Sequence, residues 1–357
     1  NAAWLSIAFA AVMTVVVCVL CRQILSWMDT PENIFEYAYS YIFIIFLGIP
    51  ATYLYNLLSG IIRSLGDSRT PVIFLVISAT LNILFDLLAI LVLHMGVAGA
   101  AWATVLSQLI SGILCFLYMR KQYDILKFEK DEMKFEGRQA IILCNMGIPM
   151  GLQYSITAIG TMMVQTSQNL LGSNIVAAFT AASKIEQVVT QAYVALGTTM
   201  ATYCAQNIGA GKIKRIRKGF KSATIMASIY AVVTAALIMT VGKYMTYLFV
   251  SDNVIEIMSN VDIYLKCIGV FFIPLAIVNL YRNGIQGMGY GLLPMMAGVA
   301  ELIGRGVVAV IAANKRSYFG VCMASPAAWV LAGGLLLVMY YYIMLKDMKR
   351  KFPNRIE

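Results

Sequence analysis

The stretch FLGIPATYLYNLLSGIIRSLGDSRTP (residues 46–71) recurs in altered form as VFFIPLAIVNLYRNGIQGMGYGLLP (residues 270–294). A proline, two glycines and a second proline keep their order in both copies, with one residue dropped between the glycines of the second copy. The matched pairs are Pro50 with Pro274, Gly60 with Gly284, Gly66 with Gly289, and Pro71 with Pro294. Such self-similarity predicts a fold of two related halves.

The composition indicates that both halves lie in a membrane. Of the 357 residues, 60% are hydrophobic and 12% are charged, with a mean hydropathy of +0.78, whereas a soluble protein carries about a quarter charged residues. Apolar runs of about 20 residues, the length that crosses a bilayer, recur along the whole chain. We therefore predict an all-α polytopic membrane protein of about ten transmembrane helices in two pseudo-symmetric bundles. The predicted helices are 2–21, 37–62, 71–94, 97–119, 140–170, 175–208, 220–249, 261–285, 292–313 and 320–345.

The net charge of +10 is concentrated in short bursts between the apolar runs. Basic residues gather in 120–138, in 212–221 and in the tail KDMKRKFPNR, while the alternate loops carry few. By the positive-inside rule, both ends of the chain are expected in the cytoplasm. The charge therefore indicates membrane topology and no nucleic-acid partner, and we expect a multi-pass protein of the plasma membrane.

The repeat also predicts the domain organisation: an N-lobe bundle (1–122), a cytoplasmic linker (123–139), a C-lobe bundle (140–347) and a cytoplasmic tail (348–357). Counted back from the matched prolines, the first helix corresponds to the third helix of the second half. This asymmetry and the absence of an initiator methionine predict a fragment that lacks the first two helices.

Two polar residues interrupt the apolar run of the third predicted helix. Asn82 and Asp86 in LNILFDLL are four residues apart and project from one helical face. An isolated charge in the bilayer is costly, so such a carboxylate favours uptake of a proton or of Na⁺. Thr104 and Gln108 share a face of the next helix and offer further oxygens. A structural hydrogen bond between the helices is the alternative for this group, and Thr104 alone fits either interpretation.

The second half carries a different polar set. Glu301 and Arg305 are four residues apart on the helix equivalent to that of Asp86, and we expect them to form a self-neutralised pair lining a cavity. Direct contact with a substrate is the alternative. Gln153 is a further hydrogen-bonding side chain for a polar cavity.

No feature of the sequence indicates an enzyme or a resident cofactor. GMGYG (287–291) follows no strand and ends a membrane helix, and no G-x-x-x-x-G-K-[ST] motif occurs. His94 is the single histidine. Transport work would therefore be driven by an ion gradient or by the membrane potential.

Several strings taken in order resemble the multidrug and toxic compound extrusion (MATE) family. They are SGIIRSLGDSRTP, LNILFDLLAI followed by HMGVAGAAWATVLSQ, GIPMGLQ, and above all YCAQNIGAGK (203–212). The resemblance covers essentially the whole chain, beginning at the third helix of the family. It implies two six-helix bundles (a MATE/MOP-type, nominally 6+6 fold) around a cavity that opens alternately to the two sides of the membrane, and export of organic cations, drugs or other amphiphiles in exchange for H⁺ or Na⁺.

The resemblance also implies roles for single residues. Asn82 and Asp86 match the cation-site pair of the N-lobe, and Thr104 matches its hydroxyl contributor, which makes the three a candidate Na⁺ site. Tyr41, nine residues before Pro50, resembles a cavity tyrosine. An aspartate that the family places on its first helix has no counterpart in this chain.

Some Na⁺-coupled members place acids in the C-lobe, but GIPMGLQYSIT and IPLAIVNLYRNGIQ carry none. The resemblance therefore assigns coupling to Asp86. The candidate substrate cavity comprises Tyr41, Gln108, Gln153, Glu301 and Arg305.

The leading hypothesis is a secondary antiporter that exports amphiphilic or cationic small molecules, and we expect it to be monomeric. The alternative is a flippase of the same exporter superfamily for a lipid-linked precursor or polysaccharide. Such proteins have a strongly cationic cavity, whereas the basic residues noted within the membrane runs are only Lys184 and Arg305.

Overall fold

A computed structural model describes residues 1–27, 30–123, 134–248 and 254–351 of the chain. It divides into two compact units, Asn1–Leu143 and Cys144–Glu357. Most of the predicted linker and residues 352–357 of the predicted tail lie outside the described residues. The finer division into lobes, linker and tail therefore stays a prediction.

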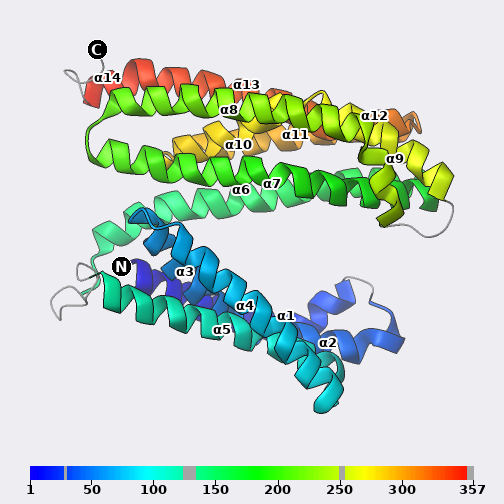
Figure 1. Cartoon of the computed structure of the whole chain (residues 1–357), viewed down its shortest axis with the longest axis horizontal. Coiled ribbons are helices and arrows are strands. Elements are labelled where there is room, and N and C mark those ends of the chain that lie inside the picture. The colour runs from blue at the N-terminus through cyan, green and yellow to red at the C-terminus, as the bar shows by residue number, and fades with distance from the viewer. Residues whose placement is uncertain (28–29, 124–133, 249–253, 352–357) are drawn as a thin grey trace. The chain divides into compact units, whose positions relative to one another are not determined.

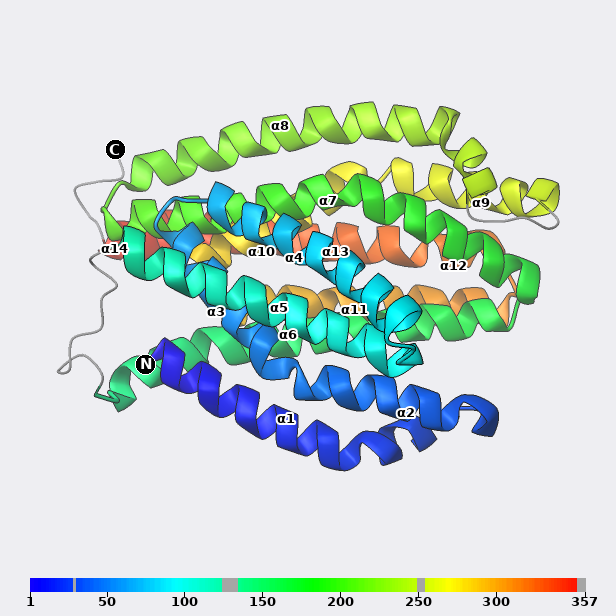
Figure 2. The same ribbon diagram turned by 60° about the horizontal axis from the view of Figure 1, so that its bottom comes forward.

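The first unit is a bundle of helices around α5, which packs against three others (Figures 1 and 2). Its elements are α1 (Ala2–Trp27), α2 (Glu32–Leu47), α3 (Ile49–Ser64), α4 (Arg69–Leu87), a π-helical turn η1 (Leu88–Val92) and α5 (Gly96–Gln122). Helix α5 contacts α2, α3 and α4, while α1 contacts α2 and α3. A small core of Leu58, Ile62, Cys115 and Met119 holds α3 against α5.

The second unit has a larger continuous core, in which α10 packs against α7, α8 and α13 (Figure 1). Helix α6 (Gly137–Asn169) leads into it from the first unit. The elements that follow are α7 (Ser173–Gly209), α8 (Ile213–Thr240), η3 (Gly242–Leu248), α9 (Val254–Gly269), α10 (Phe272–Gly287), α11 (Leu292–Asn314), α12 (Tyr318–Cys322), α13 (Ala324–Tyr342), η4 (Ile343–Asp347) and α14 (Met348–Lys351).

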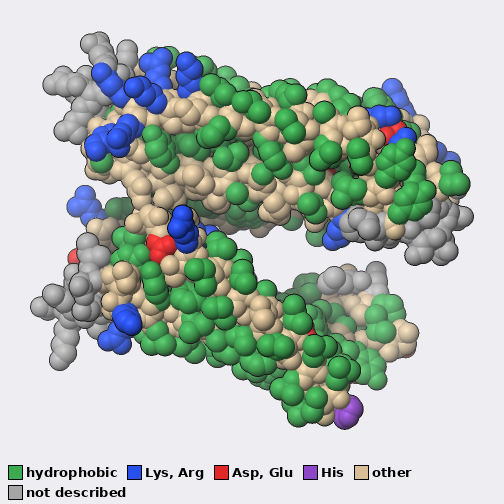
Figure 3. Space-filling model, viewed as in Figure 1, with side chains coloured by type: hydrophobic (Ala, Val, Ile, Leu, Met, Phe, Trp, Pro, Cys, Tyr) green, Lys and Arg blue, Asp and Glu red, His purple; other side chains and the backbone are tan. Residues whose placement is uncertain are grey.

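All ten predicted ranges are helical, which confirms the predicted fold class. Among the described residues, six helices are long and apolar enough to cross a membrane, or eight if each bent pair counts as one span. Helices α6 and α7 occupy the two remaining ranges but fall outside that criterion. Their flanks carry many glutamine, serine and threonine residues, as expected of helices that line polar space. Exposed apolar side chains are spread over the helices of both units (Figure 3).

Two of the predicted helices are bent in the structure. The pair α2–α3 bends by 41° at Gly48, and α9–α10 bends by 54° between Gly269 and Phe272. Pro50 and Pro274 lie in the first turn after each bend, where a missing N–H leaves no helical hydrogen bond unmade. The bends therefore fall at equivalent places in the two copies of the repeat.

The glycines that end the repeated helices adopt the same left-handed conformation. Gly66 has φ 96° and Gly289 has φ 92°, a region that other L-residues adopt only with strain. The Gly66 N–H donates to the Arg63 carbonyl, and the Gly289 N–H donates to the Gln286 carbonyl three residues back. The two halves are therefore related in backbone geometry as well as in sequence.

Asp67 lies directly after the first of these turns and two residues before the start of α4. Its Oδ1 accepts hydrogen bonds from the backbone N–H groups of Arg69 and Thr70, at 3.0 Å each. The hydroxyls of Tyr118 and Tyr123 donate to its Oδ2 at 3.3 and 3.4 Å. Hydrogen bonds from the Thr70 side chain and backbone hold the pKa of this carboxyl below its ordinary value of 3.8. Asp67 thus caps α4 and ties its start to the end of α5.

Candidate functional site

The predicted coupling residues lie on two neighbouring helices of the first unit. Asn82 and Asp86 project from α4, and Thr104 projects from α5. The Asn82 amide nitrogen donates to the Thr104 hydroxyl at 3.3 Å, and that hydroxyl donates to the Ala100 carbonyl at 3.1 Å. The structure therefore brings Asn82 and Thr104 together across the helix pair, and all three predicted residues are half-buried.

Asp86 is the member of this group with an unused hydrogen-bond acceptor. Its Oδ1 is buried and has no hydrogen-bond partner within the described part of the chain. A buried carboxylate oxygen without a donor is unfavourable unless a proton or a cation satisfies it. Among the described residues, no three histidine, cysteine or acidic side chains gather as a metal site. A Na⁺ ion at Asp86 would therefore have to complete its shell with neutral oxygens such as those of Asn82 and Thr104, a donor set that suits a hard cation.

The backbone around Asp86 is also irregular. Helix α4 ends one residue later, at Leu87, and the chain continues as the π-helical turn η1. At Gly99 a Cβ atom would lie 2.9 Å from the Ala89 Cβ, so the start of α5 packs directly against η1. π-Helical turns are rare and occur frequently at functional sites.

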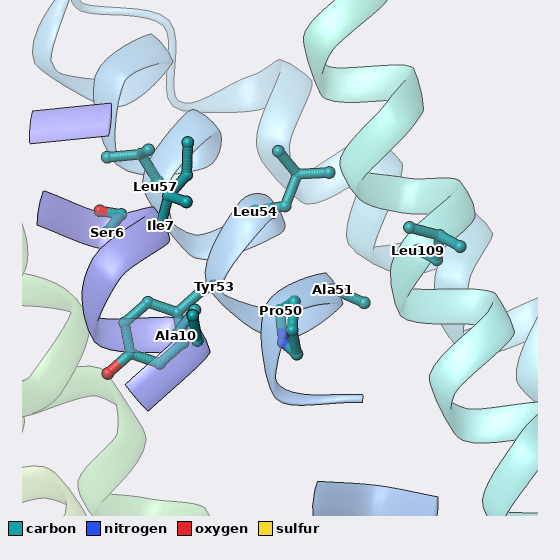
Figure 4. Close-up of a pocket in the computed structure, with 10 residues that line it drawn as sticks. Ser6, Ile7, Ala10, Pro50, Ala51, Tyr53, Leu54, Leu57 and Leu109 are labelled. Atoms are coloured by element: carbon teal, nitrogen blue, oxygen red, sulfur yellow. The ribbon is translucent and has the colours of Figure 1, made fainter. Parts of the chain in front are cut away.

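The other predicted residues of the first unit lie on the same bundle. Tyr41 on α2 is 36% exposed, and Gln108 lies one turn beyond Thr104 on α5. Neither lines the apolar cavity of about 360 Å³ between α1, α3 and α5, shown in Figure 4. That cavity is lined by Ser6, Ile7, Ala10, Ala11, Pro50, Ala51, Tyr53, Leu54, Leu57 and Leu109.

In the second unit, Glu301 and Arg305 form the predicted pair, but a third residue joins them. The Arg305 Nη2 donates to Glu301 Oε1 at 2.9 Å, and the Arg282 Nη2 on α10 donates to Glu301 Oε2 at 2.7 Å. Glu301 and Arg305 are each 4% exposed. The pair is therefore not self-neutralised, because one carboxylate serves two guanidinium groups and the cluster carries a net positive charge.

Sequence reasoning missed Arg282. It lies inside a predicted membrane helix, 19 residues before Glu301, and helical spacing cannot pair residues that far apart. A charged residue in an apolar run was the signal that could have identified it. The predicted membrane ranges therefore hold more basic residues than Lys184 and Arg305, since Lys221, Lys243, Lys266 and Arg282 also lie within them.

Gln153 is buried and already partnered. Its side-chain oxygen accepts a hydrogen bond from the Gln286 amide at 3.0 Å, which links α6 to α10. The Gly298 backbone of α11 lies close by, since a Cβ there would be 3.1 Å from the Gln153 Cγ. Gln153 thus connects three helices of the second unit.

A polar cavity of about 650 Å³ lies within the second unit. Arg305 lines it, together with the acid–tyrosine pair in which Tyr264 donates to Glu186 Oε2 at 2.6 Å. The remaining lining residues are Thr161, Val164, Gln165, Gln168, Val176, Phe179, Thr180, Ser183, Lys184, Gln187, Thr190, Val194, Leu275, Asn279, Ser325 and Trp329. Of the predicted cavity residues, Arg305 alone is among those that line it.

Comparison with solved structures identifies the architecture as that of a MATE transporter. A crystal structure of MATE in the bent conformation matches 98% of this chain and 78% of its own, with a TM-score of 0.90 and 19% sequence identity. At that identity the match establishes the fold alone.

Sequence comparison identifies the family. The family model described as MatE matches residues 1–88 and 146–311, so the chain belongs to the MatE family. The probable multidrug resistance protein YpnP of Bacillus subtilis (strain 168) is 34% identical over 277 residues, 78% of this chain and 61% of that protein. The probable multidrug resistance protein YoeA of the same organism is 26% identical over 343 residues, 93% of this chain and 73% of that protein. The chain thus spans about 61% of the length of YpnP.

Proposed function

We propose that this chain is the transport core of a secondary antiporter that exports amphiphilic small molecules in exchange for H⁺ or Na⁺. Three findings support the proposal: membership of the MatE family, the fold shared with MATE transporters, and relatives named as probable multidrug resistance proteins. The relatives give no support to the flippase alternative, and we do not propose it.

One observation carries the coupling mechanism: the buried Asp86 Oδ1 that lacks a hydrogen-bond partner. A proton or Na⁺ arriving there neutralises the carboxylate and supplies the missing partner. Asn82 and Thr104 hydrogen-bond to each other across α4 and α5 and so hold the two helices together beside the ion. Binding then favours the conformation in which the neutral site is better packed, and this differential affinity couples the ion to the substrate.

The proposal includes location and topology. The protein lies in the plasma membrane as a monomer, with both ends of this chain in the cytoplasm. Supporting this topology, lysine and arginine side chains cluster over the turn between α7 and α8 (Figure 3). The end of α5 carries Arg120 and Lys121 as well.

Reconstitution in proteoliposomes tests the coupling mechanism. Efflux of a fluorescent drug is followed under an imposed proton gradient and, separately, under an imposed Na⁺ gradient. Asp86→Asn is expected to abolish efflux under whichever gradient drives the unaltered protein. The reason is that a neutral amide neither takes up a proton nor supplies the negative charge that attracts Na⁺.

Asp262→Asn is the matched control. Asp262 on α9 forms an ion pair with Lys266 one turn along the same helix, where the partner is half-exposed. Such pairs contribute little to stability, so efflux should be unchanged. Gradient-driven efflux that survives Asp86→Asn would refute the role of Asp86.

A further inference from the structure

The lining of the polar cavity in the second unit includes a guanidinium group with unused hydrogen-bonding capacity. Arg305 reaches the cavity from α11 and is itself 4% exposed. One nitrogen is occupied by Glu301, and the second, Nη1, reaches the Thr157 carbonyl only at 3.5 Å. The third, Nε, is buried and has no hydrogen-bond partner among the described residues. Because Nε is buried, Nη1, with its single long contact, is the donor of Arg305 that is left for an acceptor from the cavity.

The charges around the cavity favour an anionic acceptor. Glu301 divides its negative charge between Arg282 and Arg305, so the cluster retains one net positive charge. The other charged residues of the lining are Lys184 and Glu186, which add one positive and one negative charge, and Glu186 is near enough to Arg305 to feel its charge. Glu186 moreover has one oxygen engaged by the Tyr264 hydroxyl. The charges on and beside the lining therefore sum to a net positive value among the described residues, and Arg305 is the one guanidinium group in that lining.

The walls of the cavity suit an amphiphile. Apolar side chains, including Phe179, Leu275 and Trp329, line it beside the amides of Gln165 and Asn279. Its volume of about 650 Å³ lies within the range of pockets that hold drug-sized molecules.

The Arg305 side chain is also held in position. A Cβ atom at Gly160 on α6 would lie 3.2 Å from Arg305 Nη1 and 3.4 Å from its Cδ, so the guanidinium packs directly against the backbone of that helix. Together with the Glu301 ion pair, this contact fixes the group before a ligand arrives. A donor fixed in advance loses less conformational entropy on binding.

We propose that this cavity binds the carboxylate of an anionic amphiphile, with Arg305 as its hydrogen-bonding partner. The inference rests on the proposed efflux function, for which it names a substrate class opposite in charge to the organic cations that the family resemblance implies. The carboxylate accepts a hydrogen bond from Arg305 Nη1, and the apolar body lies against Phe179 and Trp329.

Equilibrium binding of three matched probes tests the charge preference without any variant. The probes are dansylglycine, its methyl ester and N-(2-aminoethyl)dansylamide, which share a fluorophore and present an anion, a neutral group and a cation. Fluorescence titration of the purified protein, corrected for empty micelles, is expected to show dansylglycine binding at least about tenfold more tightly than either other probe. Equal affinities, or preference for the cation, would overturn the proposal.

Two arginine variants test the residue. Arg305→Gln and Arg282→Gln each remove one guanidinium group from Glu301 and leave it the other, so they change the charge equally. Of these two arginines, only Arg305 lines the cavity. Arg305→Gln should abolish the preference for dansylglycine over its ester, and Arg282→Gln should retain it. If both variants lose the preference equally, the preference comes from the net charge of the cluster and not from a contact with Arg305, and the role of Arg305 is overturned.

These measurements separate the inference from the proposed function. They are made without an ion gradient, so selective binding of dansylglycine by a protein that fails to catalyse gradient-driven efflux would refute only the antiport proposal. Gradient-driven efflux of a cationic drug together with no preference for dansylglycine would refute only the anion site.

Discussion

Substitution of Gly284 by alanine tests how tightly the repeated helix α10 packs in the second unit. A Cβ atom at Gly284 would lie 2.3 Å from the Cζ and 2.8 Å from the Cε1 of Phe220 on α8. Phe220 is 1% exposed, and the ring centroids of Tyr281 and Tyr340 lie 4.9 and 4.5 Å from the centroid of its ring. The ring therefore has no free space into which it can move, and the clash must separate α10 from α8.

The internal repeat supplies the matched control. Gly60 on α3 is the counterpart of Gly284, and no atom lies within 4 Å of a Cβ built there. Replacing glycine by alanine within an exposed helix gains about 1 kcal/mol of helix propensity, while overpacking a closed core costs about 1–3 kcal/mol or more. Gly60→Ala is therefore expected to stabilise by up to about 1 kcal/mol. The closeness of the Phe220 ring places Gly284→Ala at about 2–3 kcal/mol within that range, so a net destabilisation of about 1–2 kcal/mol is expected after the same gain is subtracted.

Thermal unfolding in detergent, followed by intrinsic fluorescence, measures the difference. At roughly 2–4 °C per kcal/mol, the midpoint of Gly284→Ala should lie roughly 5–10 °C below that of Gly60→Ala. Midpoints that coincide, or a stabilised Gly284→Ala variant, would show that the two bundles are equally loose at this position and refute the packing argument.

Three further perturbations have expected outcomes in the same assay. Glu301→Gln leaves the buried Arg305 and the partly buried Arg282 without their counter-charge and should cost about 3–5 kcal/mol, whereas Arg282→Gln should cost less because Glu301 keeps its other arginine. Gly66→Ala places an L-residue at φ 96° and should lower stability by about 1–2 kcal/mol. The Thr70 side chain and backbone lower the folded-state pKa of Asp67, so its stabilising contribution is complete above about pH 5 and is lost as the pH falls through the lowered pKa. Asp67→Asn should therefore flatten the acid side of a plot of unfolding midpoint against pH.

Each of these expectations has a contrary result. Arg282→Gln as harmful as Glu301→Gln would mean that the carboxylate does not depend on having two partners. An unchanged midpoint for Gly66→Ala would mean that the turn relaxes to another conformation at no cost. A variant at Asp67 with the same acid slope as the unaltered protein would assign that slope to other carboxyls.

The sequence predicts the helices of this fold well and their breaks poorly. Apolar runs about as long as a bilayer is thick can satisfy their backbone groups there only as helices, and all ten are helical. Where such a run bends is decided by local backbone packing, which hydropathy does not report. The bends at Gly48 and before Phe272 therefore divide two ranges that the sequence presents as single helices.

In the candidate sites, likewise, the sequence predicts contacts within one helix but not contacts between helices. Spacing of four residues correctly pairs Glu301 with Arg305 and places Asn82 beside Asp86 on one face. Contacts between helices depend on packing that no short spacing encodes, so the sequence did not reveal that Arg282 shares Glu301. The hydrogen bond between Tyr264 and Glu186, 78 residues apart, is of the same kind.

The twin left-handed glycines suggest how two copies of one ancestral segment acquired separate tasks. The residue after Gly66 is Asp67, a helix cap tied to two tyrosines, whereas the residue after Gly289 is Tyr290, whose hydroxyl accepts a hydrogen bond from Lys351 at 3.1 Å. The same backbone turn thus precedes an acidic residue that binds the start of α4 in one copy and a tyrosine that binds the last residue of α14 in the other. Divergence after duplication would then have replaced side chains around a preserved torsion angle. Distant duplicates in other membrane proteins should accordingly be easier to detect from backbone torsions than from residue identities.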